Sequence, residues 1–140
     1  MQPLTRPGTL SIGDYWMPRT KSARALLRGT WRSDRERTVA QWVYPKRLAA
    51  KRRKWFESIF GHLVIQYTAA FEICSSKGKR SRRRYRVVWS REGPVFPQLF
   101  IVTKDSDGEK GQHIFFDSPD SFYVQGGKCA EFFKRVRVKH

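Results

Sequence analysis

The feature that most constrains this fold is the alternation of apolar and polar residues that begins after Gly61. Apolar side chains occupy every second position in segments such as Leu63–Tyr67 and Tyr85–Trp89, which is typical of strands with one buried face. Short turns separate these segments, and turns this short join only antiparallel neighbours. The sequence therefore predicts a mainly β fold, an antiparallel up-and-down barrel of about eight strands with one helical segment after the first strand.

The remaining strands and turns follow from the same pattern. Further strands are predicted around Phe71–Ile73, Val95–Thr103, Gln112–Phe116, Phe122–Gln125 and Glu131–Val136. The predicted turns are Ser75–Arg80, Arg91–Pro94, Lys104–Gly111, Ser118–Asp120 and Gly126–Gly127. Asp105-Ser106-Asp107-Gly108 is similar to the start of a calcium loop but lacks the third acidic ligand and the distal Glu. We therefore interpret it as a hairpin turn.

A Gly-x-Trp motif, Gly29-Thr30-Trp31, precedes these strands. An indole can plug one end of a small closed barrel, and a glycine lets the backbone turn close beside it. We expect Trp31 to be such a plug rather than a substrate contact, because buried aromatic side chains usually contribute packing area.

A helical region separates this motif from the alternating segments. Ser33 and Glu36 have the S-x-x-E spacing of a capping box, which predicts a helix that begins near Asp34. Proline is tolerated at the first position of a helix, and glycine commonly follows the last. A second helix is therefore predicted over Pro45–Phe60, ended by Gly61.

The second predicted helix is amphipathic and strongly basic. At 100° per residue its apolar arc contains Tyr44, Leu48, Trp55, Phe56 and Ile59. Arg52 projects within this arc, where its charge must reach water along its own stem, pair with Glu57 or Glu72, or meet a ligand. We favour the first two roles over the ligand.

Length and composition indicate one domain. We assign residues 23–140 to the barrel and residues 1–22, which Pro and Gly interrupt, to an irregular extension that lies on it through Tyr15, Trp16 and Met17. Charges break the first thirty residues, so we expect no signal peptide, no membrane span and a cytoplasmic location. Cys74 and Cys129 lie far apart with no Cys/His pairing nearby, and we interpret both as reduced thiols.

The order of these elements resembles bacterial lipocalin-like domains of the calycin type. The similarity covers Leu27 to Val136 and depends on these segments: Leu27-Arg28-Gly29-Thr30-Trp31-Arg32-Ser33-Asp34, a helix with an inner Pro-Lys-Arg-Leu, His62-Leu63-Val64-Ile65-Gln66-Tyr67-Thr68, Tyr85-Arg86-Val87-Val88, and Glu131-Phe132-Phe133-Lys134-Arg135-Val136. The resemblance implies a small up-and-down barrel with a helix beside or across one opening, and in many such domains an apolar pocket. The family has no single function, so the resemblance does not assign one.

The formal net charge of +17 makes an anionic partner the first expectation. Two segments without carboxylates concentrate this charge, Lys46–Lys54 and Lys77–Arg86. The aromatic side chains of Trp55 and Tyr85 are within reach of these cations for stacking on bases. We therefore expect non-enzymatic binding to a polyanion, with nucleic acid first and an anionic membrane surface as a variant. The expected contacts are Lys46, Arg47, Lys51, Arg53, Lys54, Lys79, Arg80, Arg82, Arg83, Arg84 and Arg86. The competing interpretation is a solvated basic face.

An alternative function is a carrier of a small apolar or amphipathic anionic ligand, held inside the barrel. Its pocket residues would be Trp31, Arg52, Tyr67, Phe71, Tyr85 and Trp89. Arg52 would then select an amphipathic anion such as a fatty acid.

An enzyme is the least supported class. His62, His113 and His140 have neither H-E-x-x-H spacing nor an adjacent acidic pair, so we expect no metal and no acid–base role for them. Neither cysteine lies in a recognisable nucleophile motif. We expect no cofactor.

Overall fold

The computed structural model describes residues 22–92, 96–126 and 129–137, which form a closed β-barrel with short helices. In chain order the elements are α2 (Ala23–Leu27), β1 (Gly29–Ser33), α3 (Arg35–Ala40), α4 (Ala50–Ser58), β2 (Val64–Tyr67), β3 (Phe71–Ser76), β4 (Lys79–Arg91), β5 (Gln98–Asp105), β6 (Gly108–Ser118), β7 (Ser121–Gly126) and β8 (Cys129–Arg135). The predicted extension lies, apart from Ser22, outside the described residues, and so do its expected contacts through Tyr15, Trp16 and Met17.

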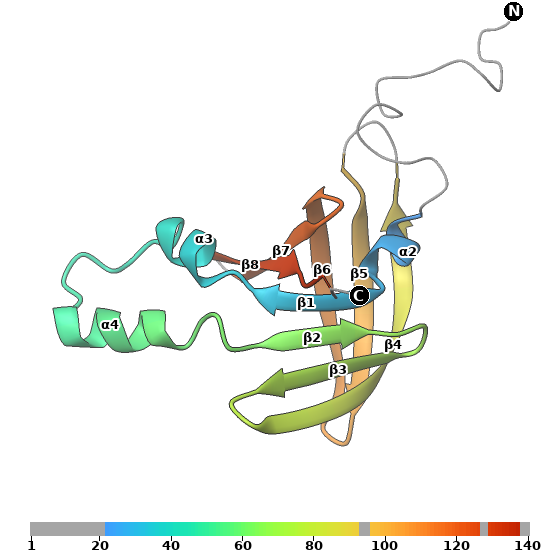
Figure 1. Ribbon diagram of the computed structural model, residues 1–140, viewed down its shortest axis with the longest axis horizontal. Helices are drawn as coiled ribbons and strands as arrows, with labels where there is room; N and C mark the ends of the chain where they lie inside the picture. The colour runs from blue at the N-terminus through green and yellow to red at the C-terminus, as the bar shows by residue number, and fades with distance from the viewer. Residues whose placement is uncertain (1–21, 93–95, 127–128, 138–140) are drawn as a thin grey trace, which may run out of the picture.

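Each strand pairs antiparallel with the next, and β8 pairs with β1 to close the barrel (Figure 1). The predicted fold class is therefore confirmed: a mainly β, closed antiparallel barrel of eight strands with a helical segment after the first strand. Alternate side chains of the strands fill the interior. Those at most 9% exposed include Trp31, Ile65, Tyr67, Tyr85, Leu99, Ile101, Ile114, Phe116, Phe122 and Phe133.

Helix α2 covers one end of the barrel. Its Ala23, Leu26 and Leu27 are buried in the core, and the hydroxyl of Ser22 caps its first turn by accepting from the Ala25 amide. Trp31 is fully buried below the helix and donates its indole N–H to the Leu27 carbonyl over 2.8 Å. The predicted role of Trp31 as a plug is confirmed.

Arg135 joins this end of the chain to the last strand. Its guanidinium carbon lies 4.2 Å from the centre of the Trp31 ring, and its nitrogens donate to the carbonyls of Leu26, Arg28 and Pro119. Arg135 can make these contacts because its side chain points into the end of the barrel. Burial lowers the pKa of the Arg135 guanidinium from its ordinary value.

Helix α3 begins where the sequence predicts but has a different cap. Asp34, not Ser33, is the N-cap, and its carboxylate accepts from the Arg37 amide. The Ser33 side chain faces the barrel interior, where its hydroxyl donates to Glu131 over 2.9 Å and accepts from the Gly61 amide over 3.0 Å. Because Ser33 still belongs to β1, its alternation in the strand decides which way it points.

The second predicted helix is shorter than expected. The chain makes a turn after Pro45, in which the Leu48 amide donates to the Pro45 carbonyl, and α4 begins only at Ala50. No residue of α4 is buried, because the helix extends away from the barrel (Figure 1).

We call residues 41–60 the arm. A cluster of aromatic rings holds it together: Trp42 lies 5.0 Å from Phe56 and 5.1 Å from Phe60, measured between ring centroids. The Tyr44 hydroxyl donates to the Glu57 carboxylate over 2.6 Å. These contacts give the arm a small core of its own.

Strand β4 is longer than predicted and contains an irregularity. The predicted turn before it shrinks to Lys77 and Gly78, which both have positive φ (50° and 82°), as a two-residue hairpin of this twist requires. The register shifts between Val87 and Trp89. Trp89, predicted on the same face as Tyr85, therefore lies on the outer face with 44% of its surface exposed.

Candidate functional site

The outer face of β4 carries four arginines at alternating positions: Arg80, Arg82, Arg84 and Arg86. We call them the arginine ridge. All four are exposed, and successive members are about 6.6 Å apart along the strand, since a strand rises about 3.3 Å per residue. Strand alternation alone produces this row of positive charge.

Neighbouring strands hold the ridge in place. The guanidinium carbons of Arg82 and Arg84 lie 4.5 Å and 5.1 Å from the centre of the Phe71 ring on β3. Lys104 on β5 is the register partner of Arg84 and extends the positive charge sideways. Arg86 has a loose ion pair with Glu109, 3.7 Å between exposed groups. Such exposed pairs are weak, so the charge stays available.

Arg83 belongs to a different environment, although it was predicted as a polyanion contact. Its side chain enters the barrel and pairs with Glu72 over 2.7 Å; Glu72 is only 2% exposed and also accepts from the Tyr67 hydroxyl over 2.8 Å. Asp105 lies 3.6 Å from the same guanidinium. A buried carboxylate requires such partners, so Arg83 neutralises the interior rather than the surface.

The outer face of β1–β4 has no carboxylate among the described residues. Glu72, the sole acidic residue of these strands, points inward. Across this face runs a register row of Lys134, Arg32, Val64, Ser75 and Arg80, one residue from each of five neighbouring strands. Neighbouring strands are about 4.8 Å apart, so Arg32 lies roughly 14 Å from Arg80. The ridge is therefore one side of a wider basic surface.

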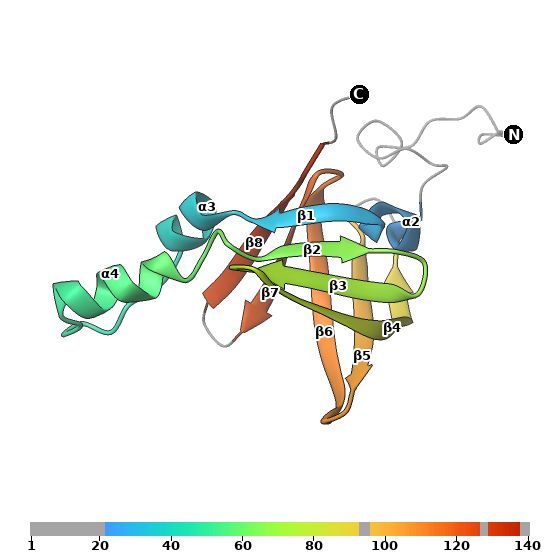
Figure 2. The same ribbon diagram turned by 60° about the horizontal axis from the view of Figure 1, so that its bottom comes forward.

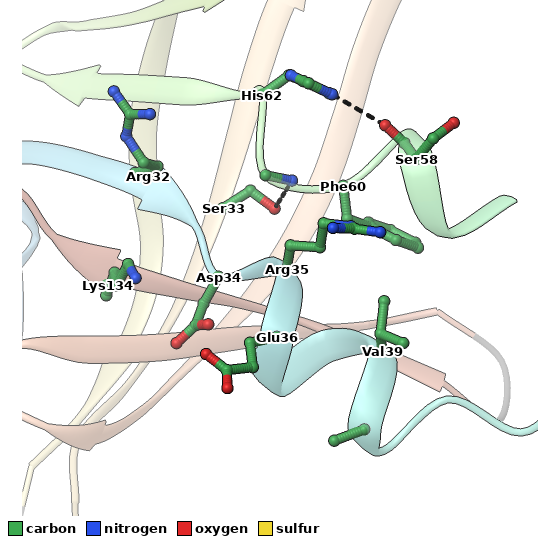
Figure 3. A pocket seen from close by; sticks show the side chains of 12 residues that line it. Arg32, Ser33, Asp34, Arg35, Glu36, Val39, Ser58, Phe60, His62 and Lys134 are labelled. Atoms are coloured by element: carbon green, nitrogen blue, oxygen red, sulfur yellow. Dashed lines mark hydrogen bonds between the residues drawn. The ribbon is translucent and has the colours of Figure 1, made fainter. Parts of the chain in front are cut away.

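The row ends at an open groove of about 850 Å³ outside the barrel (Figure 3). Arg32 and Lys134, on neighbouring strands, form one wall, and Ser58, Phe60 and His62 approach from the end of the arm. Asp34 and Glu36 at the start of α3 also line it, so its charge is mixed. His62 is held by the Ser58 carbonyl, 2.9 Å from its Nε2.

Arg32, Lys104 and Lys134 are basic surface residues that the sequence reasoning missed. Each lies outside the two dense basic segments. The available signal was alternation: Arg32 directly follows the buried Trp31, and Lys134 follows the buried Phe133, so both had to point outward.

The predicted basic residues of the arm lie on the segment that extends away from the barrel (Figure 1). Lys46, Arg47, Lys51 and Lys54 are exposed. Arg53 is instead engaged with Glu57 over 3.1 Å and lies over the Tyr44 ring at 4.5 Å. Hydrogen bonds from Tyr44 and Arg53 lower the pKa of the Glu57 carboxyl from its ordinary value.

The arm and the ridge approach each other through β2 and β3. Val64, at the start of β2 just after the arm, is the register partner of Ser75, and Ser75 pairs in turn with Arg80. Figures 1 and 2 show α4 and the turn between β3 and β4 at the same end of the barrel, opposite α2. The arm and the start of the ridge therefore lie at the same end of the barrel.

The residues of the alternative pocket do not meet around one cavity. Trp31, Tyr67 and Tyr85 fill the interior, while Phe71 and Trp89 lie on the outer face. Arg52 is exposed on α4, away from the barrel. The interior at this level is packed with side chains.

A smaller cavity of about 370 Å³ lies at the open rim. Trp42 and Phe60 from the arm, Val124 from β7, and Cys129 and Glu131 from β8 are among its lining residues. Burial raises the pKa of the Glu131 carboxyl from its ordinary value, and the hydrogen bond from Ser33 opposes this rise only in part.

Other chemistry-bearing groups are held in structural contacts. Both cysteines are free, and burial raises the pKa of the Cys74 thiol to about 11, so at neutral pH it is a thiol and not a nucleophilic thiolate. His113 lies 3.0 Å from the Gln98 side-chain oxygen. His140 lies outside the described residues.

Comparison with protein families, with curated proteins and with solved structures gives no match for this chain. Within the described part of the chain, no group of three or more His, Cys, Asp or Glu is placed to hold a metal ion. No helix in that same part is long and apolar enough to cross a membrane.

Proposed function

We propose that this chain is a non-enzymatic binding protein whose basic outer surface contacts nucleic acid. The observation that carries the proposal is the arginine ridge: four exposed cations in one row, on the outer face of β1–β4, where the described residues of these strands supply no carboxylate. Within the described part of the chain, the one carboxylate paired with the ridge is Glu109 of β6, in its loose contact with Arg86. Like charges held in a row repel one another, and an anionic polymer relieves that repulsion.

The phosphate backbone is the polyanion that suits this surface. Arginine binds phosphate through its planar fork of donors, and phosphates bound by cations release their counterions. Arg80, Arg82 and Arg84 with Lys79, Lys51 and Lys54 supply about six contacts, which correspond to a slope of log affinity against log salt near −5 on duplex DNA. None of these residues belongs to a motif that recognises the edges of bases, so we propose no preference for a nucleotide sequence.

We also propose the lipocalin-like assignment of the barrel. Its support is the order of elements: a Gly-x-Trp plug, helices beside one opening, and strands paired in chain order. A carrier function is less well supported, because Trp31, Tyr67 and Phe122 occupy the interior. A cytoplasmic location belongs to the same proposal and agrees with free cysteines.

The test measures binding of a mixed-sequence DNA or RNA at several salt concentrations. The ridge variant carries Arg80→Gln, Arg82→Gln and Arg84→Gln. A matched control carries Arg24→Gln, Arg28→Gln and Lys110→Gln, three exposed cations outside the ridge and the arm. Both variants lose three charges, so a difference between them reports position and not net charge.

We expect the ridge variant to lower the slope on duplex DNA by about 2.7 and the control to change it little, because each lost phosphate contact lowers it by about 0.9. Equal effects of the two variants would show that binding depends on the net charge and not on the position of the cations, and would overturn the proposed surface. Vesicles with anionic lipid and a panel of fatty acids are measured alongside. Binding to either, without binding to nucleic acid at low salt, would replace the proposal with the membrane or carrier function.

A further inference from the structure

A row of aromatic rings crosses the outer faces of β4 to β8. Its members are Trp89, Phe100, His113, Phe115, Tyr123 and Phe132, which we call the aromatic ladder. Outer faces of a barrel usually present polar side chains, so a continuous row of rings on one points to a contact surface.

The middle of the ladder is already stacked on itself. The Phe115 ring lies 4.0 Å from His113 on one side and 5.1 Å from Tyr123 on the other, with interplanar angles of 23° and 8°. Both faces of Phe115 are thus covered. Phe132 is buried, and the Arg37 guanidinium closes that end at 4.2 Å. These rings form a rigid support without a free face for a ligand.

Trp89 is the exposed end of the ladder. Its ring meets His113 edge to face, 5.6 Å away at 89°, and 44% of its surface is exposed. The register shift after Val87 turns it to the outer face of β4, where it follows Arg86 at the end of the arginine ridge. From Arg80 to Trp89 the strand spans roughly 30 Å.

We propose that the ligand is a single-stranded nucleic acid lying along β4, with phosphates on the arginine ridge and a base stacked on Trp89. This inference rests on the proposed function and names its substrate class. A duplex hides the faces of its bases, whereas an unpaired base has two free faces and stacks on an aromatic ring whatever its identity. Cations in a row beside an exposed indole are the combination that single strands require.

An acidic protein would use the ridge without a need for Trp89 beside it, and the anionic vesicles measured with the ridge variant distinguish a lipid surface from a nucleic acid. On the ladder side, Lys104 next to the ridge adds positive charge for a phosphate chain, while the Glu109 carboxylate offsets part of the Arg86 charge through its loose pair.

The experiment compares a deoxythymidine oligonucleotide with a duplex carrying the same number of phosphates, at the same series of salt concentrations for both. The variants are Trp89→Ala, Trp89→Phe, which keeps a ring, and Val88→Ala as a matched control. Val88 is the neighbouring residue, is 51% exposed and carries no ring. Circular dichroism and thermal unfolding of each variant report whether the barrel is intact.

We expect Trp89→Ala to weaken binding of the single strand by about 5- to 150-fold, the effect of losing one stacked base. Duplex binding and the salt slope should stay unchanged, because no charge is removed. Trp89→Phe should recover part of the loss, and Val88→Ala should cause none. Binding of the single strand should also quench the protein's tryptophan fluorescence in the wild type more than in Trp89→Ala.

A folded Trp89→Ala that binds the single strand as the wild type does would overturn the stacking inference while leaving the ridge proposal intact. An equal loss for single strand and duplex would overturn it as well, since the residue would then act through the shape of β4. Failure of the ridge variant to lower binding of either nucleic acid would instead remove the proposed function itself. The two failures are therefore distinguishable.

Discussion

The two faces of β4 use the same amino acid for opposite purposes. Arg83 on the inner face pairs with Glu72, which is 2% exposed, and completes a buried network with Tyr67. Arg82 and Arg84, its direct neighbours in sequence, lie on the outer face and flank the Phe71 ring in contact with water. An arginine's role here follows from its position in the two-residue period of the strand, and composition alone cannot distinguish the two roles.

The largest expected effect comes from removing the inner arginine. Arg83→Ala leaves the Glu72 carboxylate buried without its cation, and we expect a loss of about 3 kcal/mol in the free energy of unfolding. This is the lower end of the range for broken buried pairs, because 27% of the Arg83 side chain remains exposed. Urea unfolding at pH 7 measures it.

The double variant Arg83→Met with Glu72→Gln is the control for that experiment. Removing both charges together should restore much of the stability, since no unpaired buried charge remains. A cost below about 1 kcal/mol for Arg83→Ala would place Arg83 with the surface arginines and remove the contrast between the faces.

Glu131 is a second carboxylate on the inner surface, and it differs from Glu72 because no cation among the described residues pairs with it. Glu131 accepts a hydrogen bond from Ser33, and burial raises its pKa. A raised pKa means that the protonated form stabilises the folded state. This contribution is fully present below the ordinary carboxyl pKa and is lost as the pH rises through the raised value.

Glu131→Gln cannot ionise, so we expect it to be more stable than the wild type at pH 7 and nearly equal to it at pH 3.5. The difference in unfolding midpoint between the two proteins, followed from pH 3.5 to 7.5, measures this. A difference that is constant with pH would show that folding does not change the pKa of the Glu131 carboxyl, and would contradict the expected rise.

On the outer face, Arg84→Gln should act on binding and hardly on stability. We expect the salt slope for duplex DNA to fall by about 0.9 and the free energy of unfolding to change by less than about 1 kcal/mol. Salt titrations and urea unfolding of the same preparation give both values. A stability loss as large as that of Arg83→Ala would contradict the separation of the faces.

The smallest effect is expected for Phe71→Leu. It removes the ring between Arg82 and Arg84 but keeps an apolar side chain, so the free energy of unfolding should fall by about 0.5–1 kcal/mol. The salt slope should not change, since all charges remain. A changed slope would mean that the ring positions the ridge for its phosphates and does more than stabilise the strand.

Much of the fold was predictable because it depends on local periodicity. The alternation of Leu63, Ile65 and Tyr67 and the short turns determine an antiparallel barrel, and Trp31 is buried as expected. The five-residue α2 was missed, since so short a helix forms only by packing on the barrel end. The length of α4 was overestimated because the chain makes a turn after Pro45, and the helix begins only at Ala50.

The composition predicted which segments carry the candidate site, but not which side chains lie on the outer face of the barrel. The basic segment from Lys77 to Arg86 was identified as one cluster, yet register places Arg83 against Glu72 and the others outside. The position of Trp89 depends on a register shift that the alternation of apolar and polar residues does not predict. The pairing of Arg32 with Lys134 joins the first strand to the last, so it follows from the closure of the barrel and not from any local pattern in the sequence.

The pairing of β1 with β8 also has a consequence during synthesis of the chain. Ser33 and Phe133 are register partners, so the edge of β1 that pairs with β8 has no partner until β8 has been synthesised. At about 5–20 residues per second, ribosomes leave that edge open for roughly 5–20 seconds. During this interval the unpaired edge of β1 carries the charge of Arg32. A charged side chain on an open edge discourages pairing with other nascent chains. The same cation that borders the basic surface of the finished barrel thus protects it while it is incomplete.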